Sequence, residues 1–256
     1  MRKKLDNYFH AKLILLCLLI SLTNTLSFAQ KIELEYELVA RYLFEGDARN
    51  EVEDANHGLE TSVQYETDRY GMVNSCVYMT GNNSYITIPH TEDLNWDARS
   101  ESYSICFWVK SPDPTGGVST SRRILSKWNE ILPESYPFSF QYYLEDMHAN
   151  IYEPNAGPLS CTFTDTWDGE WQHVAMIYSH ETNSLSSYLN GQFVISKTKV
   201  FNNTTSNNAD IRIGHTLTPQ VEGFYRGHFD DLYFYNRAIE ACEVEALFSG
   251  QLLQER

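Results

Sequence analysis

The chain has 256 residues, of which 34 are acidic and 19 basic, so its formal net charge at pH 7 is −15. This balance argues against a nucleic-acid-binding protein and against docking on anionic lipid, because both depend on clustered lysine and arginine. A hydrophobic fraction of 42% is typical of a globular protein, and the 14% of aromatic residues favour strands over helices.

The N-terminal segment has the pattern of a secretory signal peptide. Four basic residues lie within positions 1–12, an apolar run follows over 13–20, and Ser27-Phe28-Ala29 forms a small-x-small cleavage site. The apolar run is too short to span a membrane. A lipoprotein anchor at Cys17 is the alternative reading, but bulky leucines precede this cysteine where small residues are expected.

Cleavage defines the mature chain that we expect. Residues 1–29 are the predicted signal peptide, and residues 30–256 are a predicted single domain. Losing four basic residues and one acidic residue changes the net charge to −18. No later stretch has the length of a membrane-spanning helix. We therefore expect a secreted, extracellular or periplasmic protein without membrane insertion, and the style of the signal is bacterial.

The mature sequence predicts strands separated by turns. Apolar and acidic residues alternate from Lys31 to Leu38, which is the period of a half-buried strand. Asn190-Gly191 predicts a two-residue hairpin, because both turn positions need positive φ. A short helix is predicted over 238–248, closed by Gly250. Further strands are predicted at 41–44, 75–79, 85–88, 102–110, 138–144, 149–152, 172–179, 185–189, 192–199, 210–213 and 227–235.

This succession predicts an all-β fold. Many short strands without a βαβ rhythm indicate an antiparallel two-sheet β-sandwich, such as a jelly roll, with one short C-terminal helix. Four cysteines remain in the mature chain, and their spacing excludes a CxxC metal or redox motif. Both free thiols and disulfides are compatible with the sequence, and it does not rank the possible pairings of Cys76, Cys106, Cys161 and Cys242.

Several motifs stand in an order that resembles a known family. They are Leu43-Phe44-Glu45-Gly46, Asp54-Ala55-Asn56-His57-Gly58, Tyr85-Ile86-Thr87-Ile88-Pro89, Tyr103-Ser104-Ile105-Cys106-Phe107-Trp108-Val109-Lys110, Trp171-Gln172-His173-Val174-Ala175 and Phe229-Asp230-Asp231-Leu232-Tyr233. This order resembles a laminin G-like domain, related to pentraxins, of the concanavalin A-like lectin/glucanase superfamily. The resemblance implies a concanavalin A-like jelly roll with one concave sheet. Because members of the family bind glycans or proteins or act structurally, the fold alone implies no activity.

A calcium site is predicted in the first loop. Asp54 and Asn56 offer two side-chain oxygens beside Gly58, which suits a hard cation with six to eight oxygen ligands. In similar proteins this loop lies beside an aspartate on the last long strand, which Asp230 matches. Asp231 points to the opposite face if that strand alternates regularly. The predicted ligand set for a structural Ca2+ is therefore Asp54, Asn56, Gly58 and Asp230, whereas Asp54 and Asn56 bonding to their own turn is the alternative.

Aromatic residues in loops are the candidates for ligand binding. Rings displayed above a sandwich can stack on sugar faces, and their alternative role is to anchor the loops. The candidates are Trp96, Trp128, Trp167, Tyr136 and Tyr225.

Catalytic residues are not predicted. Retaining glycosidases need two carboxyl groups about 5–5.5 Å apart, which acids at i and i+2 on one strand can supply. The stretches 33–37 and 51–55 come near this pattern. The first is better explained as a solvated edge, and the second breaks at Ala55 and runs into a turn.

The sequence therefore predicts a secreted, non-catalytic binding module for extracellular carbohydrate. The first alternative is protein–protein adhesion to a cell-surface protein or a structural role in an envelope. The second is a polysaccharide hydrolase or lyase. The particular glycan or protein partner and the oligomeric state do not follow from the sequence.

Overall fold

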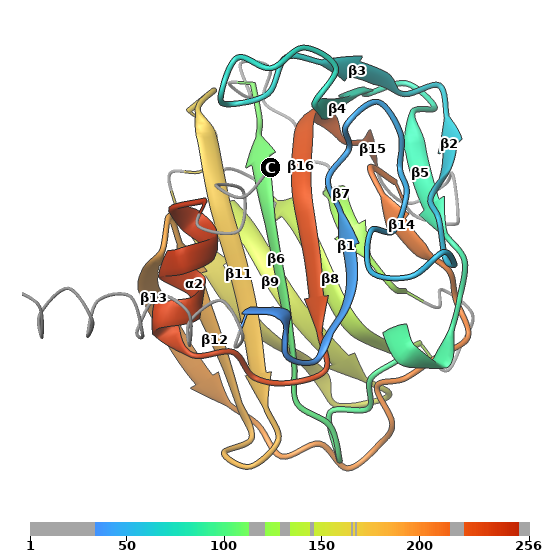
Figure 1. Ribbon diagram of the computed structural model, residues 1–256. Coiled ribbons are helices and arrows are strands. Elements are labelled where there is room, and N and C mark those ends of the chain that lie inside the picture. The colour runs from blue at the N-terminus through green and yellow to red at the C-terminus, as the bar shows by residue number, and fades with distance from the viewer. Residues whose placement is uncertain are drawn as a thin grey trace, which may run out of the picture. The chain divides into compact units, whose positions relative to one another are not determined.

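The computed structural model describes residues 34–112, 121–128, 134–143, 146–164, 166, 168–215 and 223–250. Residues 37–251 form one compact unit, which contains all the described strands (Figure 1). Among the residues described, no helix is long and apolar enough to span a membrane.

Two antiparallel sheets make up this unit. The first sheet has the order β13-β12-β11-β6-β16-β4-β3, with β1 also paired to β16. Its strands are β1 (Leu38–Tyr42), β3 (Gln64–Glu66), β4 (Cys76–Thr80), β6 (Tyr103–Lys110), β11 (Trp171–Ser179), β12 (Ser184–Leu189), β13 (Gln192–Thr198) and β16 (Arg226–Tyr235). The order is not sequential, because β16, the last strand of the chain, lies between β6 and β4.

The second sheet has the order β10-β9-β8-β7-β14-β5-β2, and β15 pairs in parallel with β7. Its strands are β2 (Leu59–Thr61), β5 (Tyr85–Ile88), β7 (Arg122–Ser126), β8 (Tyr136–Tyr143), β9 (Asp146–Glu153), β10 (Gly157–Phe163), β14 (Ile211–Ile213) and β15 (Gly223–Phe224). A 3₁₀ turn, η1 (Glu92–Leu94), and one helix, α2 (Ala241–Phe248), complete the described elements. The predicted all-β sandwich with a short C-terminal helix is confirmed.

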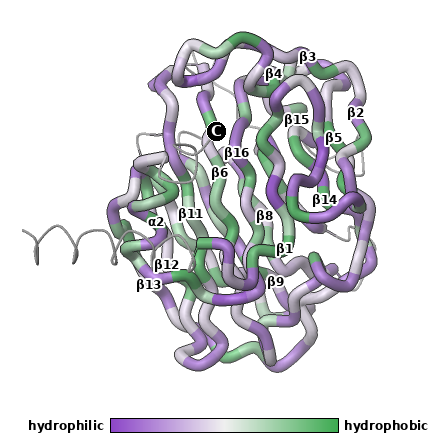
Figure 2. Tube along the Cα trace, in the orientation of Figure 1, coloured by the Kyte–Doolittle hydropathy of each residue, from purple (hydrophilic) through white to green (hydrophobic). Residues whose placement is uncertain are grey.

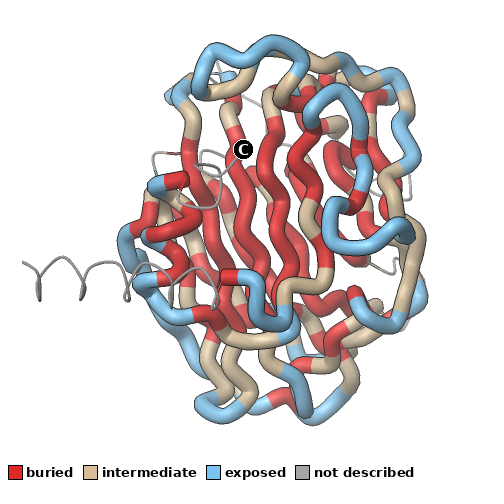
Figure 3. Tube along the Cα trace, viewed as in Figure 1, coloured by how far each residue is buried: buried red, intermediate tan, exposed pale blue. Residues whose placement is uncertain are grey.

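The core lies between the two sheets. Alternate residues of β6 and β8 point inward, and the ring of Phe107 lies 4.8 Å from that of Phe140 and 4.9 Å from that of Phe229. Figure 2 shows hydrophobic residues concentrated along the strands and hydrophilic ones in the connecting loops. Figure 3 shows the corresponding buried strand centres and exposed loops. Burial of these apolar side chains stabilises the fold by roughly 25 cal/mol per Å².

Most predicted strands are present, with two kinds of difference. The strand predicted over 31–38 is not present in the part of that segment that the structure describes, residues 34–38. Residues 34–35 are helical, and β1 begins only at Leu38. The chain also has strands that the pattern did not predict, among them β10, whose Gly157 and Pro158 resemble a turn. The predicted hairpin is confirmed, with φ of 51° at Asn190 and 76° at Gly191.

Three of the cysteines, Cys76, Cys106 and Cys161, are free thiols. Cys76, Cys106 and Cys161 are buried, and Cys242 is exposed on α2. The burial of three thiols in two packed sheets agrees with a domain that needs no disulfide for its core.

The outer faces of the two sheets differ. Helix α2 covers part of the first sheet, because the ring of Phe248 lies 5.6 Å from Trp108 and 6.1 Å from His173 (Figure 1). Along one side of the sandwich, Lys197 of β13 and Lys199, just after it, donate to backbone carbonyls at Ser160 and Gly157 of β10. The outer face of the second sheet is not covered by α2, and it carries mostly polar side chains.

Candidate functional site

A row of polar side chains crosses the outer face of the second sheet. The inward residues of each strand are apolar, for example Phe138 and Phe140 on β8, so their neighbours point outward. Strand register then aligns outward residues from β5 to β10. The row consists of Thr87, Arg212, Ser126, Ser139, Asn150 and Ser160, of which Arg212 and Ser160 are partly exposed and the other four are buried. At about 4.8 Å per strand, five spacings extend over roughly 24 Å.

Aromatic rings lie beside the middle of this row, on or next to β7, β8 and β9. Trp128 and Tyr136 meet edge to face at 5.8 Å, and Tyr136 stacks on Tyr152 at 5.3 Å. The Arg123 guanidinium lies 4.1 Å from the Trp128 ring and donates to Ser139 Oγ at 2.9 Å. Trp128 and Tyr152 are half-buried, so these two rings are partly accessible. The structure thus brings together two of the predicted ligand-binding residues, Trp128 and Tyr136.

Three donors on this face have no hydrogen-bond partner. They are Nε1 of Trp128, Nδ2 of Asn150 and Nε of Arg212, and each atom is buried. Buried polar groups in folded proteins are nearly always paired, with protein, water or ligand. All three groups are N–H donors, so a water or a ligand oxygen can pair with each of them.

The other predicted rings do not lie at this face. Trp96 is 2% exposed between Tyr103 and Phe234, and Tyr225 is 1% exposed, with its hydroxyl near Ser111 Oγ at 3.0 Å. The prediction that these two rings stack on a sugar is therefore wrong. Both rings pack in the core, and neither has a face open to a ligand. Trp167 lies outside the described residues.

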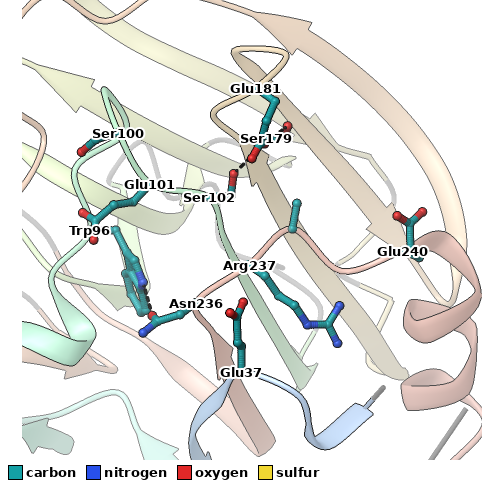
Figure 4. Close-up of a pocket in the computed structure, with 11 residues that line it drawn as sticks. Glu37, Trp96, Ser100, Glu101, Ser102, Ser179, Glu181, Asn236, Arg237 and Glu240 are labelled. Carbon is teal, nitrogen blue, oxygen red and sulfur yellow. Dashed lines mark hydrogen bonds between the residues drawn. The ribbon is translucent and has the colours of Figure 1, made fainter. Parts of the chain in front are cut away.

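A polar pocket of about 560 Å³ lies beside the end of β16 (Figure 4). Its carboxylates come from Glu37, Glu101, Glu181 and Glu240. Glu181 accepts hydrogen bonds from Ser102 at 2.9 Å and Ser179 at 3.0 Å, and Trp96 donates to Asn236 at 2.6 Å. Because these lining groups are exposed or paired with one another, the pocket gives no sign of a missing ligand comparable to that on the second sheet.

The predicted calcium loop has other local contacts. Asp54 is 88% exposed, accepts from Arg49 at 3.4 Å and lies 3.2 Å from His57 Nε2. The Asn56 carbonyl accepts from the Tyr42 hydroxyl at 2.7 Å. Gly58 has a packing role, because a Cβ there would lie 2.6 Å from Ile86 and 2.8 Å from Ala48.

Asp230, the predicted ligand on the last strand, is part of a buried ionic cluster. Arg69 donates to Asp230 at 2.6 Å and also to Asp231, and its guanidinium lies 4.4 Å from the Trp108 ring. The three side chains are at most 7% exposed. Burial raises the pKa of Asp230 well above its ordinary value, and the neighbouring Asp231 adds to that increase. Burial raises the pKa of Asp231 as well, against the influence of Arg69.

The expectation that Asp231 points away from Asp230 is wrong. The pairing of β16 with β6 shifts between Asp230 and Tyr233, and Asp231 has φ of 45°. Such a bulge interrupts the alternation of the strand, so consecutive residues reach the same guanidinium. Aspartate tolerates positive φ better than most residues, which is the only signal that the sequence carries for this arrangement.

No cluster of three or more histidine, cysteine, aspartate or glutamate residues in the described part of the chain is arranged to hold a metal ion. The carboxylates of Asp54 and Asp230 are engaged with Arg49 and Arg69 respectively. The predicted calcium ion therefore stays a prediction. In their present positions, the carboxylate oxygens of Asp54 and Asp230 do not form a calcium site.

The geometry described above is that of a two-sheet antiparallel sandwich with one polar, aromatic-flanked outer face. The sequence matches a family model, Laminin_G_3, described as the concanavalin A-like lectin/glucanases superfamily, over residues 80–245. Because the match covers more than half of the chain, the protein belongs to this superfamily, which confirms the resemblance. No curated protein sequence matches this chain.

Solved structures share the fold at low sequence identity. The binding domain of Paraclostridial Mosquitocidal Protein 1 aligns with a TM-score of 0.69 and 17% identity over 84% of this chain and 52% of its own. The botulinum neurotoxin serotype G binding domain aligns with a TM-score of 0.65 and 18% identity over 84% of this chain and 51% of its own. The botulinum neurotoxin serotype D ligand binding domain in complex with N-acetylneuraminic acid aligns with a TM-score of 0.66 and 12% identity over 88% of this chain and 53% of its own. The chain thus spans about half the length of these structures, and the likeness shows the fold alone.

Proposed function

We propose that the protein is a secreted, non-catalytic module that binds extracellular carbohydrate on the outer face of its second sheet. The observation that carries the proposal is the combination of accessible rings with buried donors that lack acceptors. Trp128 and Tyr152 can stack on the apolar face of a sugar ring. Sugar oxygens can accept from Trp128, Asn150 and Arg212.

The polar row indicates the shape of the ligand. Hydroxyl, guanidinium and amide groups follow one another across six strands rather than surrounding a single point. At roughly 24 Å the row is as long as several consecutive units of an extended glycan, and its partly exposed members, Arg212 and Ser160, lie on different strands. A chain-like polysaccharide therefore suits this face better than a single terminal sugar.

Known proteins support this proposal at the level of the fold. The titles of the similar structures call them binding domains, and one holds N-acetylneuraminic acid. The family description names both lectins and glucanases, so it is compatible with binding and with catalysis. We favour binding because residues 51–55 lie in an exposed loop and not in a strand, which removes one of the two acidic stretches that resembled a catalytic pattern.

A second candidate function is protein–protein adhesion, which one surface feature favours. The loop between β3 and β4 exposes Tyr70, Met72 and Val73 by 56%, 61% and 73%. Adjacent exposed apolar residues at a loop tip are typical of contact sites for other macromolecules. If adhesion is the function, replacing Met72 and Val73 by serine abolishes partner binding, whereas Trp128→Ala does not.

The proposal is tested by glycan-array screening of the full chain, followed by titration with the best polysaccharide. Trp128→Ala should weaken binding by about tenfold or more, which corresponds to about 1.4 kcal/mol. Phe193→Ala is the matched control, because Phe193 is a 58% exposed ring on β13 of the other sheet. Binding that survives Trp128→Ala, or that falls equally in both folded variants, contradicts a site on the second sheet.

A further inference from the structure

Two carboxylates on the first sheet share one arginine that comes from a distant loop. Arg69 lies between β3 and β4, and it contacts Asp230 and Asp231 of β16 across 161 and 162 positions of sequence. The guanidinium is enclosed by the rings of Tyr70 and Trp108, each 4.4 Å from its central carbon. The contact therefore ties one loop to the last long strand of the chain.

The loop that supplies Arg69 is ordered by its own hydrogen bonds. The Asp68 carboxylate accepts from the backbone N–H groups of Tyr70 at 2.9 Å and Met72 at 2.7 Å. The backbone N–H of Asp68 donates to the Met72 carbonyl at 3.0 Å. This turn holds Arg69 at a fixed position, so its side chain reaches β16 with less loss of conformational freedom.

The carboxylate oxygens that a calcium ion would need already accept hydrogen bonds. One Asp230 oxygen accepts from Arg69 at 2.6 Å and the other from the Asp231 backbone N–H at 2.9 Å. One Asp231 oxygen accepts from the second guanidinium nitrogen. Calcium requires six to eight oxygen ligands. The other predicted ligand, Asp54, is 88% exposed and faces Arg49.

We infer that Arg69 takes the place of a structural cation in this protein. A calcium ion on Asp230 would join a loop to the final strand by neutralising buried carboxylate charge. Arg69 does both, with a covalently attached charge and two directed hydrogen bonds. The fold therefore does not depend on divalent cations, and the two carboxylates become a cation site only when Arg69 is removed.

The experiment compares melting temperatures in millimolar calcium chloride and in excess EDTA. The wild-type chain should melt at the same temperature in both. Arg69→Ala should melt several degrees lower in EDTA, and calcium should raise its melting temperature by several degrees, because binding to the folded state alone is stabilising. Arg49→Ala, which removes the arginine beside Asp54, is the matched control and should show no calcium response.

Two results would overturn the inference. The first is a wild-type chain whose melting temperature rises with calcium and loses that rise in Asp230→Asn, because the ion would then bind beside Arg69. The second is a folded Arg69→Ala variant that does not respond to calcium, because the carboxylates would then not form a cation site. If Arg69→Ala does not fold in either buffer, the wild-type comparison with its Asp230→Asn variant decides the question.

Discussion

The outer faces of the two sheets both bury polar groups, and each has buried side-chain nitrogens without a partner in the protein, among them Nε of Arg69 and Nδ1 of His173 on the first sheet. On the first sheet, Arg69 pairs with Asp230 and Asp231, and α2 packs Phe248 against Trp108. On the second sheet, Asn150 and Arg212 keep buried N–H donors without acceptors. Burying an unpaired donor costs about 1–3 kcal/mol, so the second arrangement lowers stability unless a partner arrives. The first face thus contains a paired ionic cluster that ties a loop to the last strand, and the second contains the donors on which the proposed glycan site rests.

The largest effect is expected from breaking the ion cluster of the first face. Arg69→Met leaves Asp230 and Asp231 buried without a counter-ion, which should lower the free energy of unfolding by about 3–5 kcal/mol at neutral pH in EDTA. Urea denaturation measures the loss. Adding Asp230→Asn and Asp231→Asn removes the uncompensated charges and should recover most of it. A loss below about 1 kcal/mol in Arg69→Met would show that the cluster does not stabilise this face.

The second expected effect is a pH dependence of the free energy of unfolding. It arises at His173, which is also on the first face. Burial lowers the pKa of His173 from 6.5 to about 3, and the Arg69 charge contributes. Below pH 6.5 the unfolded chain binds a proton that the folded chain does not. Stability from this group is therefore complete above pH 6.5 and decreases by roughly 1.4 kcal/mol per pH unit as the pH falls toward 3.

The His173→Gln variant isolates this contribution from that of the carboxylates. Urea denaturation at pH 7 and pH 5 should show a smaller decrease for the variant than for the wild-type chain, by about 2 kcal/mol. An equal decrease in both proteins would mean that His173 takes up its proton in the folded state.

The fold follows from local patterns to a large extent. Short runs rich in apolar, aromatic and β-branched residues predict the long strands, for example β6 and β11, which are buried along almost their whole length. Asn190-Gly191 predicts its hairpin because few residues accept the positive φ values of that turn. Alternation fails from 31 to 38, where a regular spacing of apolar residues precedes β1 instead of forming it.

The candidate site follows from the sequence only in part. Trp128 and Tyr136 are predictable as loop aromatics, but so are Trp96 and Tyr225, which are buried. Asn150 gives no local signal, because its position opposite Ser139 and Ser160 depends on strand register. Arg69 likewise meets its partners across more than 160 residues, and the bulge at Asp231 breaks the alternation on which the prediction rested.

An intermediate effect of opposite sign is expected on the second face. Asn150→Leu replaces the unpaired amide by an apolar side chain of similar size, which should raise the free energy of unfolding by about 1 kcal/mol. The same change should weaken glycan binding, because it removes a donor. Thermal melting and titration with the polysaccharide measure the two effects. A variant that is less stable than the wild-type chain would contradict the idea that this donor lacks a partner.

The smallest effect is expected at the exposed acid of the first loop. Asp54 is 88% exposed, and its contact with Arg49 at 3.4 Å is open to solvent, so screening and side-chain entropy leave little net energy. Asp54→Ala should change the free energy of unfolding by less than about 0.5 kcal/mol, with calcium or with EDTA. A calcium-dependent loss of several times that size would show that Asp54 binds an ion that Arg69 does not replace. The contrast with Arg69→Met thus separates charge that holds the fold from charge that only faces water.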